Sequence, residues 1–226
     1  MKALYFMAMA SFGYVSMMDA DFLPPAMGGH GDISKLFDGY PYMNQDSYQL
    51  TRGYMMIAMG YHLYSLIAHC IGPSRPDFVE FLLHHIITLL LIMCGHFLNF
   101  IPIAGMISLV HDAADVFVYL ARVFVDTVYD KISLVFYVGL MIVFAYGRLY
   151  VFPVHLISNT IYFNDKTADA IPGFHFMGVI LHLLLALHIY WYFLLANIGY
   201  KYAIGAGAQD IHESDEQLMK KKQKLA

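Results

Sequence analysis

The stretch FVEFLLHHIITLLL, residues 78–91, decides the fold, because it places two adjacent histidines inside a run that is otherwise apolar. A helix that crosses a bilayer needs about 20 mostly apolar residues, and this run continues to residue 99. A charged side chain at the centre of such a helix costs about 2.5–3.5 kcal/mol, so ionisable residues there mark candidate functional sites. His84 and His85 are therefore candidate functional residues within a predicted membrane helix.

The composition of the whole chain is also that of a membrane protein. Of its 226 residues 59% are hydrophobic and 13% are charged, whereas roughly 25% are charged in an average soluble domain. Lipid offers the backbone no hydrogen-bond partners, so each span is predicted to be an α-helix. We expect an all-α polytopic membrane bundle of about six transmembrane helices, near residues 3–18, 50–72, 78–99, 102–123, 132–154 and 172–199.

The bundle is predicted to form one domain, residues 1–205, followed by a polar lysine-rich tail, residues 206–226. The distribution of Lys and Arg places both termini on the cytoplasmic-type face. The last five residues, Lys222–Ala226, fit the K-x-K-x-x pattern of a dilysine retrieval signal, which predicts the endoplasmic reticulum. The two cysteines, Cys70 and Cys94, indicate no disulfide framework.

Two neighbouring spans concentrate the ionisable residues. In the third span Glu80, His84 and Thr88 are four residues apart and share one helix face. The fourth span carries His111, Asp112 and Asp115, and a short turn makes the two spans antiparallel neighbours. The polar positions lie at similar depth, so we expect them to meet in a shared buried pocket.

Such a cluster can perform acid–base chemistry. A neutral imidazole takes up a proton, and a carboxylate on its other nitrogen fixes the tautomer; an imidazole can also carry an acyl group as a nucleophile. Hydrogen bonding that only holds the helices together is the structural alternative. A zinc or iron site is a third reading, but the spacing requires no metal and none is predicted.

The other polar residues receive weaker assignments. Packing or the lining of a water cavity is predicted for five other histidines of the second and last spans, His62, His69, His175, His182 and His188. Arg148 lies near the predicted end of the fifth span, where it either meets a phosphate headgroup or reaches the interface. Trp191 fits an interfacial aromatic belt. No pattern typical of nucleic-acid binding is present, and Pro153 is predicted to end the fifth span.

The motifs of the third and fourth spans resemble those of a known family. DFVEFLLHHIITLLL, then NFI, then HDAADVFVYLAR are similar to the TLC domain family, and within it to the ceramide synthases. The likeness extends upstream to DGYPYMNQDSYQLTRGYMMIAMGYHLYSL and downstream to YGRLYVFP and LHIYWYFLL. It therefore covers nearly the whole chain.

This resemblance implies transfer of a fatty acyl group from acyl-coenzyme A to the amine of a sphingoid base. Acyl-coenzyme A would be a cosubstrate, with no bound cofactor, and membrane lipids would surround the site. His84 and His85 would be the reactive pair. His111, Asp112 and Asp115 would complete the catalytic site, with substrate binding by Thr88, Asn99, Arg122 and Arg148.

The sequence also departs from the ceramide synthase pattern. Gly95 and His96 replace a usual Ser-Tyr pair, Pro102 replaces a basic residue near the turn, and Arg122 replaces a lysine. We also expect the family's N-terminal membrane segment to be missing. These departures favour a second hypothesis, a non-catalytic TLC-fold subunit that binds lipid within a larger complex of the mitochondrial inner membrane. A homodimer is the assembly to expect for the enzyme.

Overall fold

The computed structural model describes residues 2–38, 40, 48–72, 78–124, 130–162 and 173–204. Within these residues all regular structure is helical, which confirms the all-α prediction for the described part of the chain. The elements in order are α1 (Lys2–Met17), η1 (Pro25–Met27), η2 (Ile33–Phe37), α2 (Gln49–Ile71), α3 (Phe78–Phe97), α4 (Ile101–Phe124), α5 (Asp130–Phe144), η4 (Ala145–Tyr162) and α7 (Phe174–Ala203).

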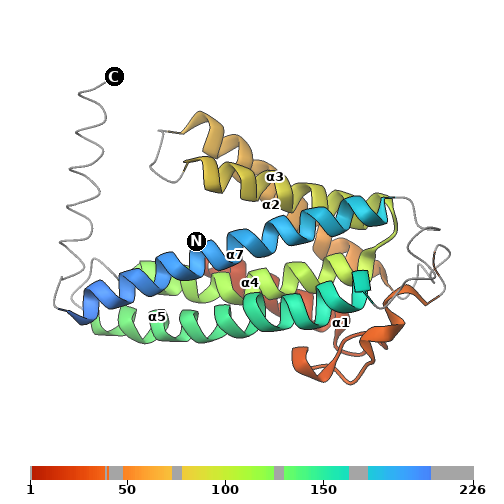
Figure 1. The fold of residues 1–226 in the computed structure, drawn as a ribbon, viewed down its shortest axis with the longest axis horizontal. Helices are drawn as coiled ribbons and strands as arrows, with labels where there is room; N and C mark the ends of the chain where they lie inside the picture. Colours follow the sequence, from red (N-terminus) through yellow and green to blue (C-terminus); the bar gives the residue numbers. More distant parts are fainter. Residues whose placement is uncertain are drawn as a thin grey trace.

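The long helices lie side by side, and α5 continues directly into η4 (Figure 1). Four helical stretches are long and apolar enough to cross a membrane: α3, α4, Lys131–Thr160 and Phe174–Tyr202. The protein is therefore an integral membrane protein. The predicted first and second spans are helices as well, but α1 has 16 residues, fewer than the roughly 20 that a span requires.

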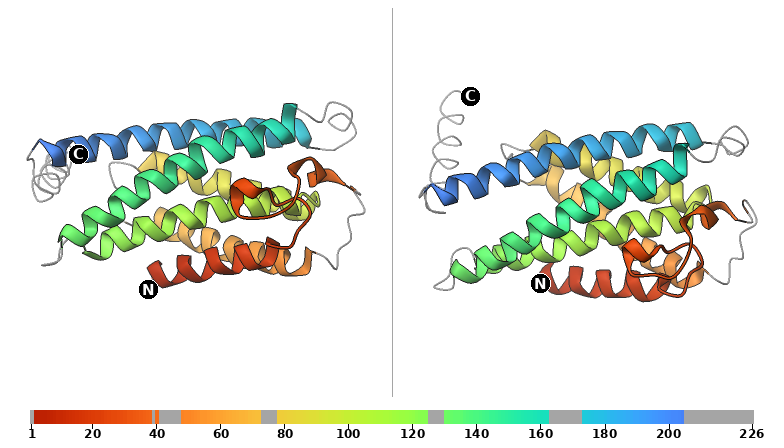
Figure 2. Two further views of the ribbon diagram at one scale, coloured as in Figure 1. Left: turned by 90° about the horizontal axis from the view of Figure 1, so that it is seen from below. Right: turned by 60° about the horizontal axis from the view of Figure 1, so that its bottom comes forward.

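Helix α4 is the central helix of the bundle. In the most apolar 18-residue stretch of α4, 67% of the residues are buried inside the protein. The corresponding share in the other three candidate spans is 17–28%. Figure 2 shows α1 and α7 on opposite sides of the bundle with α4 between them. The approach of α3 to α4 is close, because a Cβ at Gly95 would lie 2.3 Å from the Cβ of Ala104. Polar residues on α4 are consequently presented to the interior rather than to lipid.

The fifth span differs from its prediction. The helix does not end near residue 154 but continues to Tyr162, and its second half, η4, is π-helical with Pro153 inside it. In a π-helix each N–H bonds the carbonyl five residues earlier. Proline has no N–H, so the carbonyl of Arg148 loses that partner. Arg148 itself is 5% exposed in the interior of the span, so the prediction that it reaches the interface is wrong.

The bundle has two ends. One, here called the terminal end, holds Lys2, Ile71, Phe78, Phe124 and Ala203; the opposite one, the loop end, holds Met17, Gln49, Phe97, Ile101 and Phe174. Contacts between helices confirm this order, because Lys2 Nζ lies 5.5 Å from the Tyr119 ring at one end and Arg52 bonds Asn99 at the other. The predicted tail, residues 206–226, lies outside the described residues.

Residues 19–38 and 40 pack over the loop end (Figure 2). Phe22 and Leu23 from this segment are buried. The Phe37 ring lies 5.9 Å from that of Phe100, at the start of α4. The Tyr146 hydroxyl donates to the carbonyl of Ala26 at 2.8 Å and ties the segment to η4. This end of the bundle is thus covered by an apolar layer.

Candidate active site

Three imidazoles meet in the interior of the bundle, one from each of three helices. His84 comes from α3, His111 from α4 and His188 from α7. The ring centroids of His84 and His111 are 6.2 Å apart, and those of His111 and His188 are 4.8 Å apart. His188 is completely buried and His111 is 6% exposed. The predicted meeting of the third and fourth spans is therefore present, with α7 as an additional member.

The hydrogen bonds of His111 define its tautomer. Nδ1 lies 2.7 Å from the carbonyl oxygen of Ile107, and because a carbonyl can only accept, Nδ1 carries the proton. In the neutral ring the lone pair is then on Nε2, which accepts from Nε2 of His188 at 2.9 Å. The sequence analysis gave this orienting role to a carboxylate, whereas the structure gives it to a backbone carbonyl.

The two carboxylates of α4 bond partners on other helices. The hydroxyl of Tyr54 on α2 donates to Asp112 Oδ2 at 2.5 Å, and both side chains are buried. Nη2 of Arg148 donates to Asp115 Oδ1 at 2.6 Å and to the carbonyl of His111 at 3.0 Å. Asp112 and Asp115 therefore connect α4 to α2 and η4, and no ion pair between them and an imidazole is found within the described helices.

The adjacent histidines of α3 face different neighbours. His84 lies against α4 and α7, with its ring centroid 4.9 Å from that of Trp191. Its Nδ1 is 3.4 Å from the hydroxyl oxygen of Thr88. His85 lies toward α2, where its ring is 6.3 Å from His62 and 5.8 Å from His69. His84 thus belongs to the central cluster, and His85 connects it to the histidines of α2.

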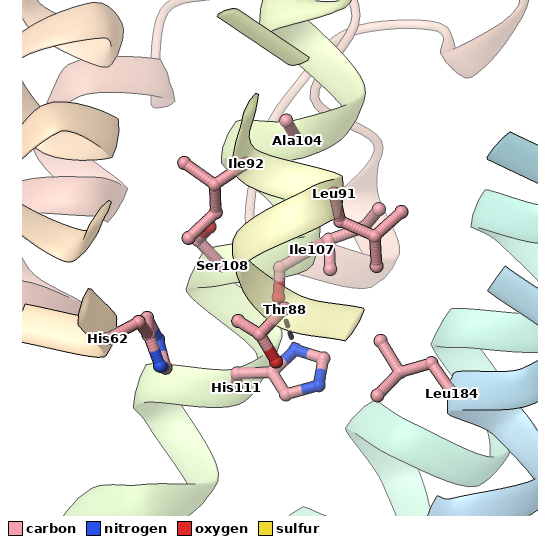
Figure 3. A pocket seen from close by; sticks show the side chains of 9 residues that line it. All are labelled: His62, Thr88, Leu91, Ile92, Ala104, Ile107, Ser108, His111 and Leu184. Atoms are coloured by element: carbon pink, nitrogen blue, oxygen red, sulfur yellow. Dashed lines mark hydrogen bonds between the residues drawn. The ribbon is translucent and has the colours of Figure 1, made fainter. Parts of the chain in front are cut away.

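A small cavity lies beside the cluster (Figure 3). Its volume is about 10 Å³, and four helices contribute to its wall. Figure 3 shows His62, Thr88 and His111 pointing toward one another across it. The polar lining residues are His62, Thr88, Ser108 and His111.

Two of the predicted substrate-binding residues lie far from this cluster. Asn99 is in the turn between α3 and α4, with φ 61°, and accepts from Arg52 Nη2 at 2.8 Å. Arg122 lies at the terminal end, 5.7 Å from the ring of Tyr119. Asn99 precedes His111 by 12 residues, and Arg122 follows it by 11. At 1.5 Å per residue along a helix, each lies roughly 16–18 Å from His111 along the axis of α4. Asn99 and Arg122 therefore stand at opposite ends of the bundle.

The other two predicted substrate-binding residues are at the site. Thr88 is 9% exposed and lies between His84 and the cavity. Arg148 is beside His111, but its guanidinium already binds Asp115 and lies 4.8 Å from the Phe144 ring. Arg148 holds the architecture of the site in this state, and a role in binding substrate would require it to exchange partners.

Sequence reasoning missed several members of the site. Tyr54, His188 and Trp191 contact the predicted residues directly, and Trp191 is not in the interfacial position predicted for it. One signal was present, because His188 and Trp191 are three residues apart on α7 and so lie on neighbouring positions of one face. Among the described residues no group of three or more His, Cys, Asp or Glu side chains is arranged to hold a metal ion.

Comparison with known proteins agrees with this architecture. Residues 1–197 match the TLC domain. Ceramide synthase 4 of Bos taurus is 24% identical over 164 residues, 72% of this chain and 42% of that protein. Ceramide synthase 4 of Homo sapiens is 25% identical over 184 residues, which are 79% of this chain and 46% of that protein. Ceramide synthase LOH2 of Arabidopsis thaliana is 28% identical over 170 residues, which are 73% of this chain and 57% of that protein.

The chain spans about half the length of the curated relatives it matches. The TLC match extends from the first residue to residue 197 and so includes every helix that contributes to the imidazole cluster. The chain belongs to the TLC domain family and resembles the ceramide synthases within it.

Proposed function

We propose that this protein is an N-acyltransferase that moves a fatty acyl group from acyl-coenzyme A to the amine of a sphingoid base inside the membrane. The observation that carries the proposal is the meeting of His84 with the bonded pair His111–His188 at the centre of the bundle. The similarity to ceramide synthases supports the choice of substrates. Both substrates have long apolar chains, which a site within lipid can accommodate.

His84 is the reactive imidazole of the proposed mechanism. When its Nδ1–H donates to Thr88 Oγ1, Nε2 keeps its lone pair. That nitrogen can remove a proton from the attacking amine, or it can attack the thioester carbonyl and carry the acyl group. His111 and His188 adjoin it as a second, hydrogen-bonded pair of imidazoles. His85 remains a proposed member of the site and faces α2.

The carboxylates have a positioning role in this proposal. Tyr54 and Asp112 join α2 to α4, while Arg148 and Asp115 join η4 to α4. Asp112 and Asp115 follow His111 by one and four residues along α4, so the two bonds fix the rotation of that helix next to the imidazole. The imidazole of His111 is consequently held toward His84 and His188.

The departures from the ceramide synthase pattern have structural explanations at the turn. Gly95 is in contact with Ala104, so a side chain larger than hydrogen would push α3 and α4 apart. Pro102 is buried. A cation is nevertheless present, because Arg52 of α2 bonds Asn99 of the turn. These features support an intact helix pair around the proposed site.

The test is acyl transfer by the purified chain in lipid nanodiscs, with a long-chain acyl-coenzyme A and a sphingoid base. We expect amide formation by the wild type, and a loss of about 10²–10⁴-fold in His84→Ala, the range typical of a removed acid–base group. Asp112→Asn should lose less than His84→Ala. The control is His182→Gln, because His182 is an exposed histidine of α7 whose Nδ1 donates to the carbonyl of Gly178.

Two results would contradict the proposal. Full activity in His84→Ala would remove the assigned residue from the chemistry. No amide from the wild type, together with isolation of the chain in a complex of fixed stoichiometry with other proteins, would instead support the lipid-binding accessory subunit. Fractionation of cells would distinguish the proposed endoplasmic reticulum location from the mitochondrial inner membrane.

A further inference from the structure

Helix α2 contributes two histidines that the proposed reaction does not use. His62 lines the small cavity beside His111, and His69 lies two residues before the end of α2 at the terminal end. Both face α3, where the rings of His84 and His85 lie 6.4 and 6.3 Å from that of His62. A row of imidazoles thus extends from the centre of the bundle toward one end.

The cavity has the size and the polarity of a water site. Its volume of about 10 Å³ is close to the smallest space that holds one water molecule, and a buried water needs two to four polar partners. The hydroxyls of Thr88 and Ser108 and the imidazole of His62 supply them. Nδ1 of His62 is buried and has no hydrogen-bond partner among the described residues, as expected for an atom that a water satisfies.

This water would connect two hydrogen-bonding groups that do not touch. On one side Thr88 Oγ1 is bonded to Nδ1 of His84; on the other is His62. A hydroxyl both donates and accepts, so a proton that leaves Nδ1 of His84 can pass through Thr88 and the water to His62. An imidazole can take up a proton at one nitrogen while it releases one at the other.

The row continues beyond His62. The rings of His85 and His69 are 5.8 Å apart, and Nδ1 of His85 is also buried and unpartnered among the described residues. His69 donates from Nε2 to the carbonyl of Phe78 at 2.9 Å, which leaves its Nδ1 lone pair available. These steps are longer than a direct hydrogen bond and require a ring rotation or one bridging water.

The proposed reaction needs such a route. A C–S bond breaks and a C–N bond forms. Of the three protons of the incoming ammonium group, one stays on the amide nitrogen, one goes to the thiolate of coenzyme A and one must leave the buried site. We propose that His62 and a water in this cavity relay that proton from His84 through Thr88 toward His85 and His69 at the terminal end. This inference rests on the proposed acyl transfer.

The kinetic test compares His62→Phe and His62→Gln with the wild type in nanodiscs. Phe removes the polar partner, whereas Gln keeps one but cannot relay a proton. We expect kcat to fall about 10²-fold in both, with the KM for each substrate unchanged. His182→Gln again serves as the control. Wild-type kcat in both variants would overturn the relay.

A second measurement does not depend on catalysis and so separates this inference from the proposed function. In ¹⁵N-histidine-labelled protein, magnetic resonance detects exchange of imidazole protons with water. We expect exchange at His62 and His84 in the wild type, and loss of exchange at His84 in His62→Phe. Absence of exchange at His62 would show a dry cavity and overturn the relay, whether or not the wild type forms an amide.

Discussion

At the scale of single residues, the bond between Tyr54 and Asp112 shows how a carboxylate is kept inside the bundle. Tyr54 is completely buried and Asp112 is 4% exposed. A buried polar group without a partner costs about 1–3 kcal/mol, and the Tyr54 hydroxyl prevents that cost by donating at 2.5 Å. A phenol on α2 is thus part of what orients α4.

The first prediction concerns this hydroxyl. Tyr54→Phe keeps the ring and leaves Asp112 Oδ2 without its donor, so we expect a loss of about 1–3 kcal/mol in stability and a fall in acyl transfer. Thermal unfolding in detergent and the amide assay measure the two effects. Tyr64→Phe is the matched control, because Tyr64 is on the same helix and 66% exposed. Equal melting temperatures for both variants would count against this role of Tyr54.

Spacing along the sequence predicted that His84 and His111 meet, but it missed His188 and did not predict how the carboxylates bond. His84 and His111 were identified because ionisable residues recur on one face of each span. His111 and Asp112 are consecutive, and consecutive side chains on a helix point in different directions, so Asp112 could not orient the ring of His111. Its partner lies 58 residues away in the chain, a separation for which sequence spacing gives no rule.

At the scale of elements, glycine sets how closely α1 approaches α2. A Cβ at Gly13 would lie 2.7 Å from the Tyr54 ring. The absent side chain therefore creates the space in which Tyr54 reaches Asp112. Helix α1 supports the site without contributing a polar group to it.

The second prediction follows from this contact. Gly13→Ala should displace the Tyr54 ring and destabilise the protein by about 1–3 kcal/mol, the usual cost of overpacking, with a parallel loss of activity. Gly60→Ala is the control on α2, because nothing lies within 4 Å of a Cβ there; it should be neutral or slightly stabilising. Melting curves check both variants. A Gly13→Ala protein as stable as wild type would show that Tyr54 has room to move.

The helices were predictable to within a few residues, with one exception. Long apolar stretches of sequence locate these helices well, because a segment within lipid must satisfy all of its own backbone hydrogen bonds and is therefore helical. Pro153 misled the prediction, because proline usually ends a helix, whereas here the backbone is π-helical on both sides of it. Pro153 and Arg148 lie within a continuous helix because η4 packs against α4 and α7. The sequence around these two residues does not reveal that packing.

At the scale of the whole molecule, the order of the helices places several basic residues at one end or the other. Lys2, Arg122, Lys131 and Lys201 lie at the terminal end, and Lys35 and Arg52 lie at the loop end. The predicted orientation, in which cytoplasmic loops carry the excess of Lys and Arg, then places the terminal end on the cytoplasmic side. The exposed Cys70 is at the terminal end as well.

The third prediction tests this orientation. A membrane-impermeant maleimide should label Cys70 from the cytoplasmic side of sealed vesicles and not from the lumenal side. Cys70→Ser should abolish the signal, because Cys94 is partly buried near the other end of α3. The measurement is the mass shift of the chain after labelling from each side. Labelling of Cys70 from the lumenal side would invert the topology.

The apolar layer formed by residues 19–38 and 40 has a consequence for how substrates reach the interior of the bundle. Phe22 and Leu23 are buried there, and Tyr146 is hydrogen-bonded to Ala26, so these residues cover part of the interior at the loop end. If the bundle performs the proposed reaction, the nucleotide head of the donor and the released thiol are expected to enter and leave where this layer does not cover the bundle.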